Sequence, residues 1–134
     1  MSGRYLLDTN VLSRLVRAPP PQLVHQMRHA GERNLCTSIV VACELRFGAR
    51  KTGSAELTSR IDQLLGSLDV LPLEAGVDAV YAELRFALEA RGQPIGANDL
   101  LIAAHALEQQ AVLVTENVGE FARVPGLRVQ QWGA

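Results

Sequence analysis

Three acidic residues lie beside or within apolar runs, where a carboxylate contributes nothing to packing. Asp8 ends a short apolar run, Glu44 lies inside a second run, and Asp99 opens a third. An ionised carboxylate in apolar surroundings is costly unless a cation or hydrogen-bond donors meet it, and only Arg46 is a close basic neighbour. Carboxylates gathered from distant segments without paired basic residues are typical of a divalent-metal site. The sequence therefore predicts a metal-dependent hydrolase.

The three carboxylates can present oxygen ligands to one or two Mg²⁺ or Mn²⁺ ions, which prefer such ligands. Three residues near the end of the chain are candidates to complete the site: Asn117 first, and failing that Glu116 or Glu120. Without metal the neighbouring acids repel one another, so the pKa of at least one should be raised. With metal, a bound water becomes acidic and charge on a phosphodiester oxygen is offset, which is the chemistry that phosphodiester cleavage needs.

Other polar residues beside these acids are candidates for supporting roles. The hydroxyls of Thr9 and Thr115 can bond a carboxylate or a metal-bound water, although Thr115 fits equally well as an ordinary β-branched strand residue. Asn10 either orients Asp8 or caps the helix that follows, and the cap is favoured. His105 lies on an otherwise apolar helix with no second histidine spaced to join it, so we expect it to pack in the core.

The acids must be positioned by alternating strands and helices. The sequence predicts strands at 4–7, 34–37, 69–73, 111–115 and 127–130, and helices at 9–16, 22–30, 38–50, 57–68, 77–88 and 98–110. Asn98 is expected to cap the last helix. Alternation of this kind indicates an α/β fold with right-handed crossovers, whose working site lies beyond the carboxyl ends of the strands. Asp8 and residues 115–117 should share that edge.

Length and composition fit one domain over residues 1–134, because 48% apolar content is ample for one core. The net charge of -1 gives no global sign of a nucleic-acid or membrane partner, so an anionic partner must be held by a local patch. Cys36 and Cys43 lie in segments expected to be buried, which indicates reduced thiols in a cytoplasmic protein. No apolar run approaches the ~18 residues of a membrane span.

Four segments of the chain, in order, resemble the motifs of the PIN-domain nucleases, specifically the VapC-type toxins of bacterial toxin–antitoxin pairs. The first two surround Asp8 and Glu44, the third surrounds Asp99, and the fourth follows the last long apolar strand. The segments are 6–13, 37–49, 96–107 and 113–121, the last continuing through 125–127. The likeness spans essentially the whole chain, including Trp132 near its end.

The resemblance implies a PIN-like three-layer fold with a central, mostly parallel sheet of four to five strands. It implies that Asp8, Glu44 and Asp99 are metal ligands in a Mg²⁺-dependent endoribonuclease. The substrate would be a structured cellular RNA of the tRNA or rRNA class, cut by attack of a metal-activated water. The family varies between Asp and Asn at the fourth position, which maps to Asn117 with Glu116 as its rival; a neutral Asn would weaken the binding of a second ion.

The resemblance also implies partners. We expect a homodimer that forms a hetero-oligomer with an antitoxin protein covering the acidic pocket. Phe47 and a stripe formed by Val11, Leu12 and Leu15 are the candidate exposed apolar surfaces for these contacts. Candidate contacts to the RNA backbone are the arginines near the first two motifs, Arg14, Arg17, Arg46 and Arg50. Aromatic content of 4% is too low for extensive base stacking.

Other functional classes fit the residues less well. An Asp after the first strand is also the nucleophile of haloacid-dehalogenase-type phosphatases, but these need a second Asp two residues on, where this chain has Asn10. A phosphoreceiver domain needs a lysine near the last strands, and the only lysine is Lys51. A non-catalytic interaction module would be expected to have lost at least one acid of the set, whereas all three are present.

Overall fold

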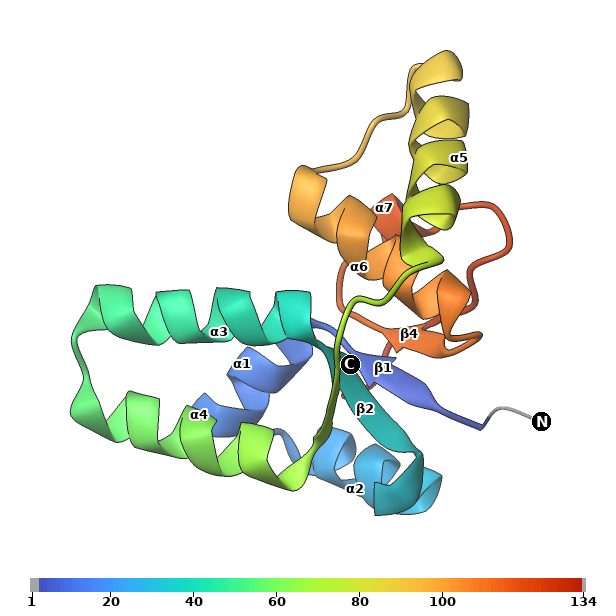
Figure 1. Ribbon diagram of the computed structural model, residues 1–134. Helices are drawn as coiled ribbons and strands as arrows, with labels where there is room; N and C mark the ends of the chain where they lie inside the picture. Colours follow the sequence, from blue (N-terminus) through green and yellow to red (C-terminus); the bar gives the residue numbers. More distant parts are fainter. Residues whose placement is uncertain (1–2, 134) are drawn as a thin grey trace.

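The computed structural model describes residues 3–133 and is built around one five-stranded sheet (Figure 1). The strands are β1 (Tyr5–Leu7), β2 (Leu35–Ser38), β3 (Asp69–Leu71), β4 (Val112–Val114) and β5 (Val129–Gln130). They lie in the order β3-β2-β1-β4-β5, and every pairing is parallel. The predicted α/β fold with a largely parallel sheet is therefore confirmed.

Helices separate the strands along the chain and flank the sheet. They are α1 (Thr9–Arg17), α2 (Pro21–Ala30), α3 (Ile39–Thr52), α4 (Ala55–Ser67), α5 (Val77–Ala90), α6 (Ala97–Glu108) and α7 (Val118–Phe121), with a 3-10 turn, η1 (Glu32–Asn34), before β2. In Figure 1, α3 and α4 extend together to one side, whereas α5 packs on α6 on the other. No helix within residues 3–133 is long and apolar enough to cross a membrane.

The chain order of the strands reverses beside β1. From β1 the chain moves to β2 and β3 on one side, and it returns to β4 on the other side. A reversal of this kind leaves a crevice beyond the carboxyl ends of the two strands that flank it, which is where open α/β sheets bind ligands. The residues that follow β1 and β4, Asp8 and Thr115, meet at this point.

The core is apolar on both faces of the central strands, as expected for a parallel sheet covered by helices. Leu6, Leu7 and Leu113 have no exposed surface. The stripe on α1 that was expected to be exposed is instead part of this core, since Val11 and Leu12 are buried and Leu15 is partly buried against it. That prediction is wrong because the amphipathic face of α1 is needed to cover the sheet.

Other differences from the predicted elements are local. Cys36 is buried, but Cys43 is exposed. The side of α3 that faces the core carries Val41 and Leu45, and Cys43 lies on the opposite side of the helix. The helix α6 begins at Ala97 with Gly96 at its N-cap, so Asn98 does not cap it. The short helix α7 was not predicted, since four residues are too few for a periodic signal. The remaining bounds agree within two residues.

Candidate active site

Asp8 is the most deeply placed acid of the candidate site. It directly follows the central strand β1 and caps α1, and only 4% of it is exposed. Its Oδ1 accepts a hydrogen bond from the backbone N–H of Thr9 at 2.8 Å, and its Oδ2 accepts one from the Thr115 hydroxyl at 2.7 Å. Burial raises the pKa of Asp8, and these two donors oppose the rise because they favour the charged form.

Glu44 reaches the site from the middle of α3. One carboxylate oxygen accepts a hydrogen bond from the Thr9 hydroxyl, and the other accepts one from the Asn98 amide at 3.1 Å. Thr9 therefore contacts two acids, Asp8 through its backbone and Glu44 through its side chain. These bonds join α1, α3 and α6 around the Glu44 carboxylate. The role of Asn98 was missed in the sequence, where its position before Asp99 indicated only a cap.

Asp99 lies in the first turn of α6 and is half-buried. Burial is the largest cause that raises the pKa of Asp99, to about 7. Contact with the carboxyl group of Glu120 raises the pKa further, as do the negative charges of Asp8 and Glu44. The expectation that at least one acid of the set has a raised pKa is confirmed. The four carboxyl groups are thus close enough to act on one another.

Glu120 comes from α7, the short helix after β4. Its Oε1 is buried and has no hydrogen-bond partner among residues 3–133, while its carboxyl group contacts that of Asp99. Two carboxyl groups in contact favour retention of a proton, which is consistent with the raised pKa of Asp99. In the sequence, Glu120 was an alternative to the preferred Asn117, as was Glu116. The sequence did not predict α7, the short helix that turns residue 120 back toward the other acids.

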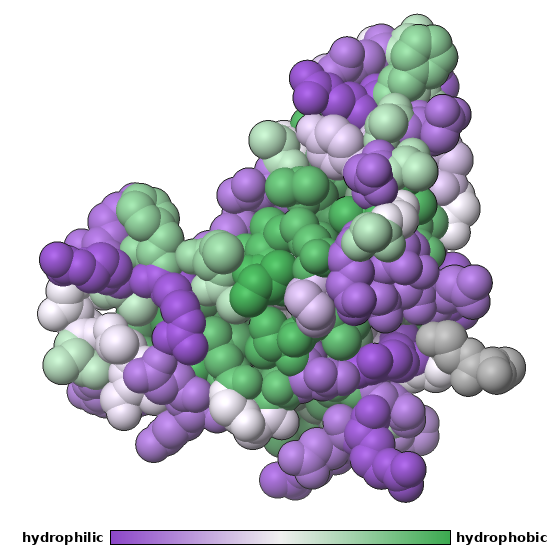
Figure 2. Space-filling model, viewed as in Figure 1, coloured by the Kyte–Doolittle hydropathy of each residue, from purple (hydrophilic) through white to green (hydrophobic). Residues whose placement is uncertain are grey.

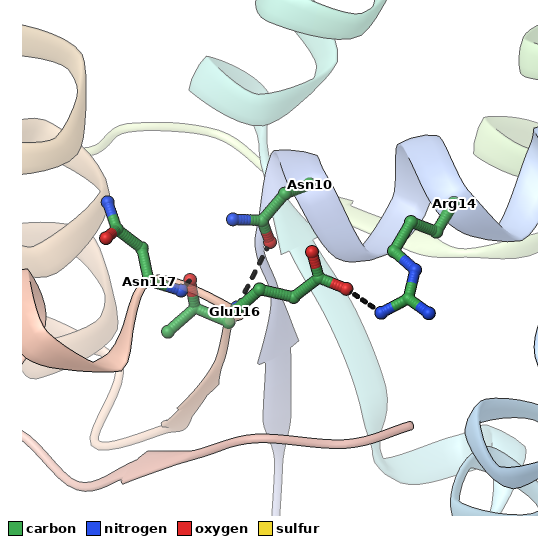
Figure 3. A network of polar contacts seen from close by, with 5 residues as sticks. Asn10, Arg14, Glu116 and Asn117 are labelled. Carbon is green, nitrogen blue, oxygen red and sulfur yellow. Dashed lines mark hydrogen bonds and ion pairs between the residues drawn. The ribbon is translucent and has the colours of Figure 1, made fainter. Parts of the chain in front are cut away.

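Asn117 and Glu116 are placed differently. Asn117 is exposed, and its backbone N–H donates to the Thr115 hydroxyl oxygen at 3.0 Å. Figure 3 shows its side chain pointing away from Asn10 and Arg14. The Glu116 carboxylate accepts from the Arg14 guanidinium, and the Glu116 N–H donates to Asn10 Oδ1 at 3.3 Å. Asp8 caps α1, and the Asn10 side chain bonds Glu116 instead, so the expected cap by Asn10 is wrong.

The chemistry of the site suits a divalent cation, because its donors are carboxylate oxygens, which hard cations such as Mg²⁺ and Mn²⁺ prefer. Within residues 3–133, no group of three or more acidic, cysteine or histidine side chains already converges on one point with the geometry of a metal site. The unpartnered Oε1 of Glu120 and the raised pKa of Asp99 nevertheless mark the carboxyl groups that a cation would stabilise. The ligand atoms of the site are therefore of the kind that a divalent cation binds.

The four arginines proposed for RNA contact differ in their surroundings. Arg14 pairs with Glu116, and Arg46 pairs with Asp62 of α4. Arg17 is exposed, as is Arg50 on α3. A cavity of about 180 Å³ beside Glu44 is lined in part by Thr9, Ser13 and Arg17, and it lies between α1, α3 and α4.

His105 packs in the core as predicted. It has no exposed surface, and its Nδ1 lies 2.7 Å from the hydroxyl oxygen of Ser38. Ser38 caps α3 by accepting from the Val40 N–H. The contact joins α6, which carries Asp99, to the start of α3, which carries Glu44. His105 thus links the two helices that carry Asp99 and Glu44, and it is not a candidate ligand.

Comparison with known proteins gives a consistent result. The PIN domain family matches residues 5–127. Ribonuclease VapC2 of Rickettsia felis is 36% identical over 130 residues, which cover 96% of this chain and 97% of that protein. The tRNA(fMet)-specific endonuclease VapC of Shigella flexneri is 32% identical over 130 residues, covering 96% and 98%.

Solved structures agree with these sequence relatives. The crystal structure of VapBC2 from Rickettsia felis, bound to a DNA fragment from their promoter, includes a chain that matches with a TM-score of 0.89 at 34% identity, covering 96% of this chain and 98% of that one. The structure of DNA-bound VapBC from Salmonella typhimurium matches with a TM-score of 0.88 at 28% identity, with the same coverage. From its sequence, its sheet and its cluster of acidic side chains together, the chain belongs to the PIN-domain family, among the VapC ribonucleases.

Proposed function

We propose that this chain, as a single PIN domain over residues 1–134, is a Mg²⁺- or Mn²⁺-dependent endoribonuclease that acts in the cytoplasm as the toxin of a toxin–antitoxin pair. One observation carries the proposal. Four acidic residues from four separate elements, Asp8, Glu44, Asp99 and Glu120, act on one another at the switch point of the sheet. So many mutually repelling carboxyl groups lower the stability of the free protein, and a bound cation would offset that repulsion.

Asp8, Glu44 and Asp99 are the proposed metal ligands. For the fourth position we favour Glu120, because its buried carboxylate oxygen lacks a partner and its charge acts on both Asp8 and Asp99. Asn117 stays the alternative that the family pattern favours. Whether the site holds one ion or two follows from this choice, since four carboxylates balance more positive charge than three.

The chain's own residues position and tune the carboxylates. Thr115 and the Thr9 N–H hold both oxygens of Asp8 in place, and Thr9 and Asn98 do the same for Glu44. A divalent cation held by these groups would supply an acidified water and positive charge for the phosphodiester. Burial and contact with the Glu120 carboxyl group raise the pKa of Asp99 to about 7, so a proton on Asp99 competes with a cation for this carboxylate.

The proposed substrate is a structured RNA of the tRNA class. Support comes from the relative named tRNA(fMet)-specific endonuclease VapC, which is 32% identical over nearly the full length of both chains. The low aromatic content argues for recognition through RNA shape and phosphates instead of stacked bases. The exposed Arg17, in the cavity beside Glu44, is the best placed of the four arginines to contact a phosphate.

The proposed protein partners are an antitoxin and a second copy of the chain. Solved relatives are VapBC complexes, which support an antitoxin that covers the acidic pocket, with an arginine as the expected contact to the carboxylates. Phe47, which is 66% exposed, and Phe86, which is 73% exposed, are apolar side chains available for such contacts. Figure 2 shows apolar surface gathered between the pair of helices α3 and α4 and the pair α5 and α6.

The direct experiment incubates purified protein with total bacterial tRNA, with Mg²⁺ or with excess EDTA. Cleavage is expected only with metal. Asp99→Asn should lower the rate at least about a hundredfold, because it removes a ligand. Asp78→Asn, at an exposed acid on α5, is the matched control and should cleave as the unmodified protein does. Undiminished cleavage in EDTA would refute the proposal.

A growth experiment tests the toxin role. Induced expression in a bacterial host without the antitoxin should arrest growth, whereas Asp99→Asn should be harmless. Mapping the RNA ends that appear shortly after induction would identify the substrate. Harmless expression of an active nuclease would contradict the toxin role without contradicting the enzymatic one.

A further inference from the structure

A polar network joins the start of α1 to the segment that follows β4, next to the proposed metal ligands but without including any of them. Figure 3 shows Asn10 and Arg14 on α1 reaching toward Glu116. Asn10 Oδ1 accepts from the backbone N–H of Glu116 at 3.3 Å, and the Arg14 guanidinium donates to the Glu116 carboxylate. Glu116 is thus held at its backbone and at its side chain by residues one helical turn apart.

We propose that Asn10, Arg14 and Glu116 are positioning residues that fix the segment from Thr115 to Glu120 for the reaction, and that Arg14 acts through Glu116 and not on the RNA. The inference rests on the proposed nuclease function for its catalytic consequence. We name the three residues the α1–116 clamp.

The first argument is geometric. Thr115 precedes Glu116 in the chain. Its hydroxyl donates to Asp8 at 2.7 Å and accepts from the Asn117 N–H at 3.0 Å. On the other side of Glu116, α7 begins at Val118 and carries Glu120. The clamp therefore fixes the residue between the group that holds Asp8 and the helix that presents Glu120. A shift of Glu116 would move both.

The second argument concerns charge. Glu116 lies in the same segment as Glu120, but its carboxylate accepts from the Arg14 guanidinium. A cation in contact offsets the negative charge of Glu116. The clamp therefore neutralises one acid of this segment.

The third argument concerns Arg14 itself. Its side chain is 41% exposed and that of Glu116 is 27% exposed, so the pair is only partly screened by water. An arginine whose guanidinium is already bound to a carboxylate contributes less to phosphate binding than a free one. Among the arginines near the site, Arg14 is therefore assigned to positioning, whereas the exposed Arg17 stays a candidate for RNA contact.

The first test needs no metal and no RNA. Amide hydrogen exchange of residues 115–121 would be measured by mass spectrometry in metal-free protein for Arg14→Gln and Glu116→Gln. Both should exchange roughly fivefold faster there, as expected for loss of one half-exposed ion pair. The reversed pair, Arg14→Glu with Glu116→Arg, should restore much of the protection. Arg85→Gln is the control, since it breaks the exposed Arg85–Glu89 pair at 2.9 Å on α5.

The second test measures kcat and KM for RNA cleavage with the same variants. Positioning predicts that Arg14→Gln and Glu116→Gln each lower kcat about tenfold with little change in KM, and that the double variant is no worse than either. If Arg14 contacts RNA, Arg14→Gln will raise KM and Glu116→Gln will not, which overturns the inference. Unchanged exchange in both variants also overturns it. If the unmodified protein cleaves no RNA, the proposed function fails while the exchange result still decides the clamp.

Discussion

The acidic cluster formed by Asp8, Glu44, Asp99 and Glu120 has a strand side, at Asp8, and a helix side, at Asp99 and Glu120. The two sides hold their carboxylates in different ways. Asp8, at the end of β1, is 4% exposed and accepts two hydrogen bonds, from the Thr9 N–H and the Thr115 hydroxyl. Asp99, at the start of α6, is half-buried, and its carboxyl group contacts that of a second acid, Glu120. One acid is fixed by donors, and the other is opposed by a neighbour of the same charge.

This difference indicates two roles in one site. The two donors set the orientation of the Asp8 carboxylate and oppose the rise in its pKa that burial causes. Burial and contact with Glu120 raise the pKa of Asp99, so a proton on Asp99 competes with any cation that binds there. The strand side should therefore respond mainly to loss of hydrogen bonds, and the helix side mainly to pH and to metal.

The largest expected effect tests the strand side. Thr115→Val removes the donor to Asp8 and the acceptor of the Asn117 N–H while keeping a β-branched shape. Loss of a hydrogen bond to a buried charged group should lower the free energy of unfolding by about 1.5–3 kcal/mol. Urea denaturation in EDTA at pH 7 measures this change.

Thr58→Val on α4 is the matched control for that measurement. The Thr58 hydroxyl donates to the Ser54 carbonyl at 3.0 Å, but the residue is exposed, so its loss should cost less than about 0.5 kcal/mol. Equal losses in the two variants would show that Asp8 does not depend on its donors, and the contrast between the two sides would then have no basis.

The sequence predicts the strand side better than the helix side, for a physical reason. Asp8 follows a strand whose apolar residues fix its place at the sheet edge, and Thr115 follows the neighbouring strand, so parallel pairing alone brings them together. Glu120 depends on α7, a single turn with no periodic pattern. Asn98 fits a helix cap and a hydrogen bond to Glu44 equally well in sequence, and only tertiary contact decides between them.

The same reasoning explains the error at Asn10. Next to an Asp that ends a strand, an Asn is a good cap in sequence terms, but the Asp takes that place itself and frees the Asn side chain for a partner 106 residues away. Pairings over such distances, including Arg14 with Glu116, leave no trace in local spacing. Family resemblance supplied the proposed ligands, but these supporting contacts required the structure.

The second prediction tests the helix side through metal affinity. Because the pKa of Asp99 is raised to about 7, only a minority of molecules have this carboxylate ionised at pH 6, and a proton competes with the cation. Affinity for Mn²⁺ should fall roughly tenfold between pH 8 and pH 6, as measured by isothermal titration calorimetry. In Asp99→Asn the remaining affinity should be low and should depend much less on pH. The same affinity at both pH values in the unmodified protein would contradict the raised pKa.

The smallest expected effect is a gain in stability of the metal-free protein on substitution of Asp99, whereas most substitutions lower stability. The pKa of Asp99 is about 7 in the folded protein against 3.8 as its ordinary value, so between these pH values the folded state keeps a proton that the unfolded state has lost. Stability from this group is therefore greatest below pH 4, falls as pH rises toward 7, and stays reduced above it.

Asp99→Asn cannot ionise and escapes this loss. In EDTA its melting temperature should exceed that of the unmodified protein by roughly 2–4 °C at pH 8, and the difference should largely disappear at pH 4.5. Asp62→Asn, at an exposed acid paired with Arg46 on the protein surface, should shift the melting temperature by less than about 1 °C at either pH. A lower melting temperature for Asp99→Asn at pH 8 would mean that the Asp99 carboxylate is held by hydrogen-bond donors in the free protein, as the Asp8 carboxylate is, and the two sides of the acidic cluster would then not differ.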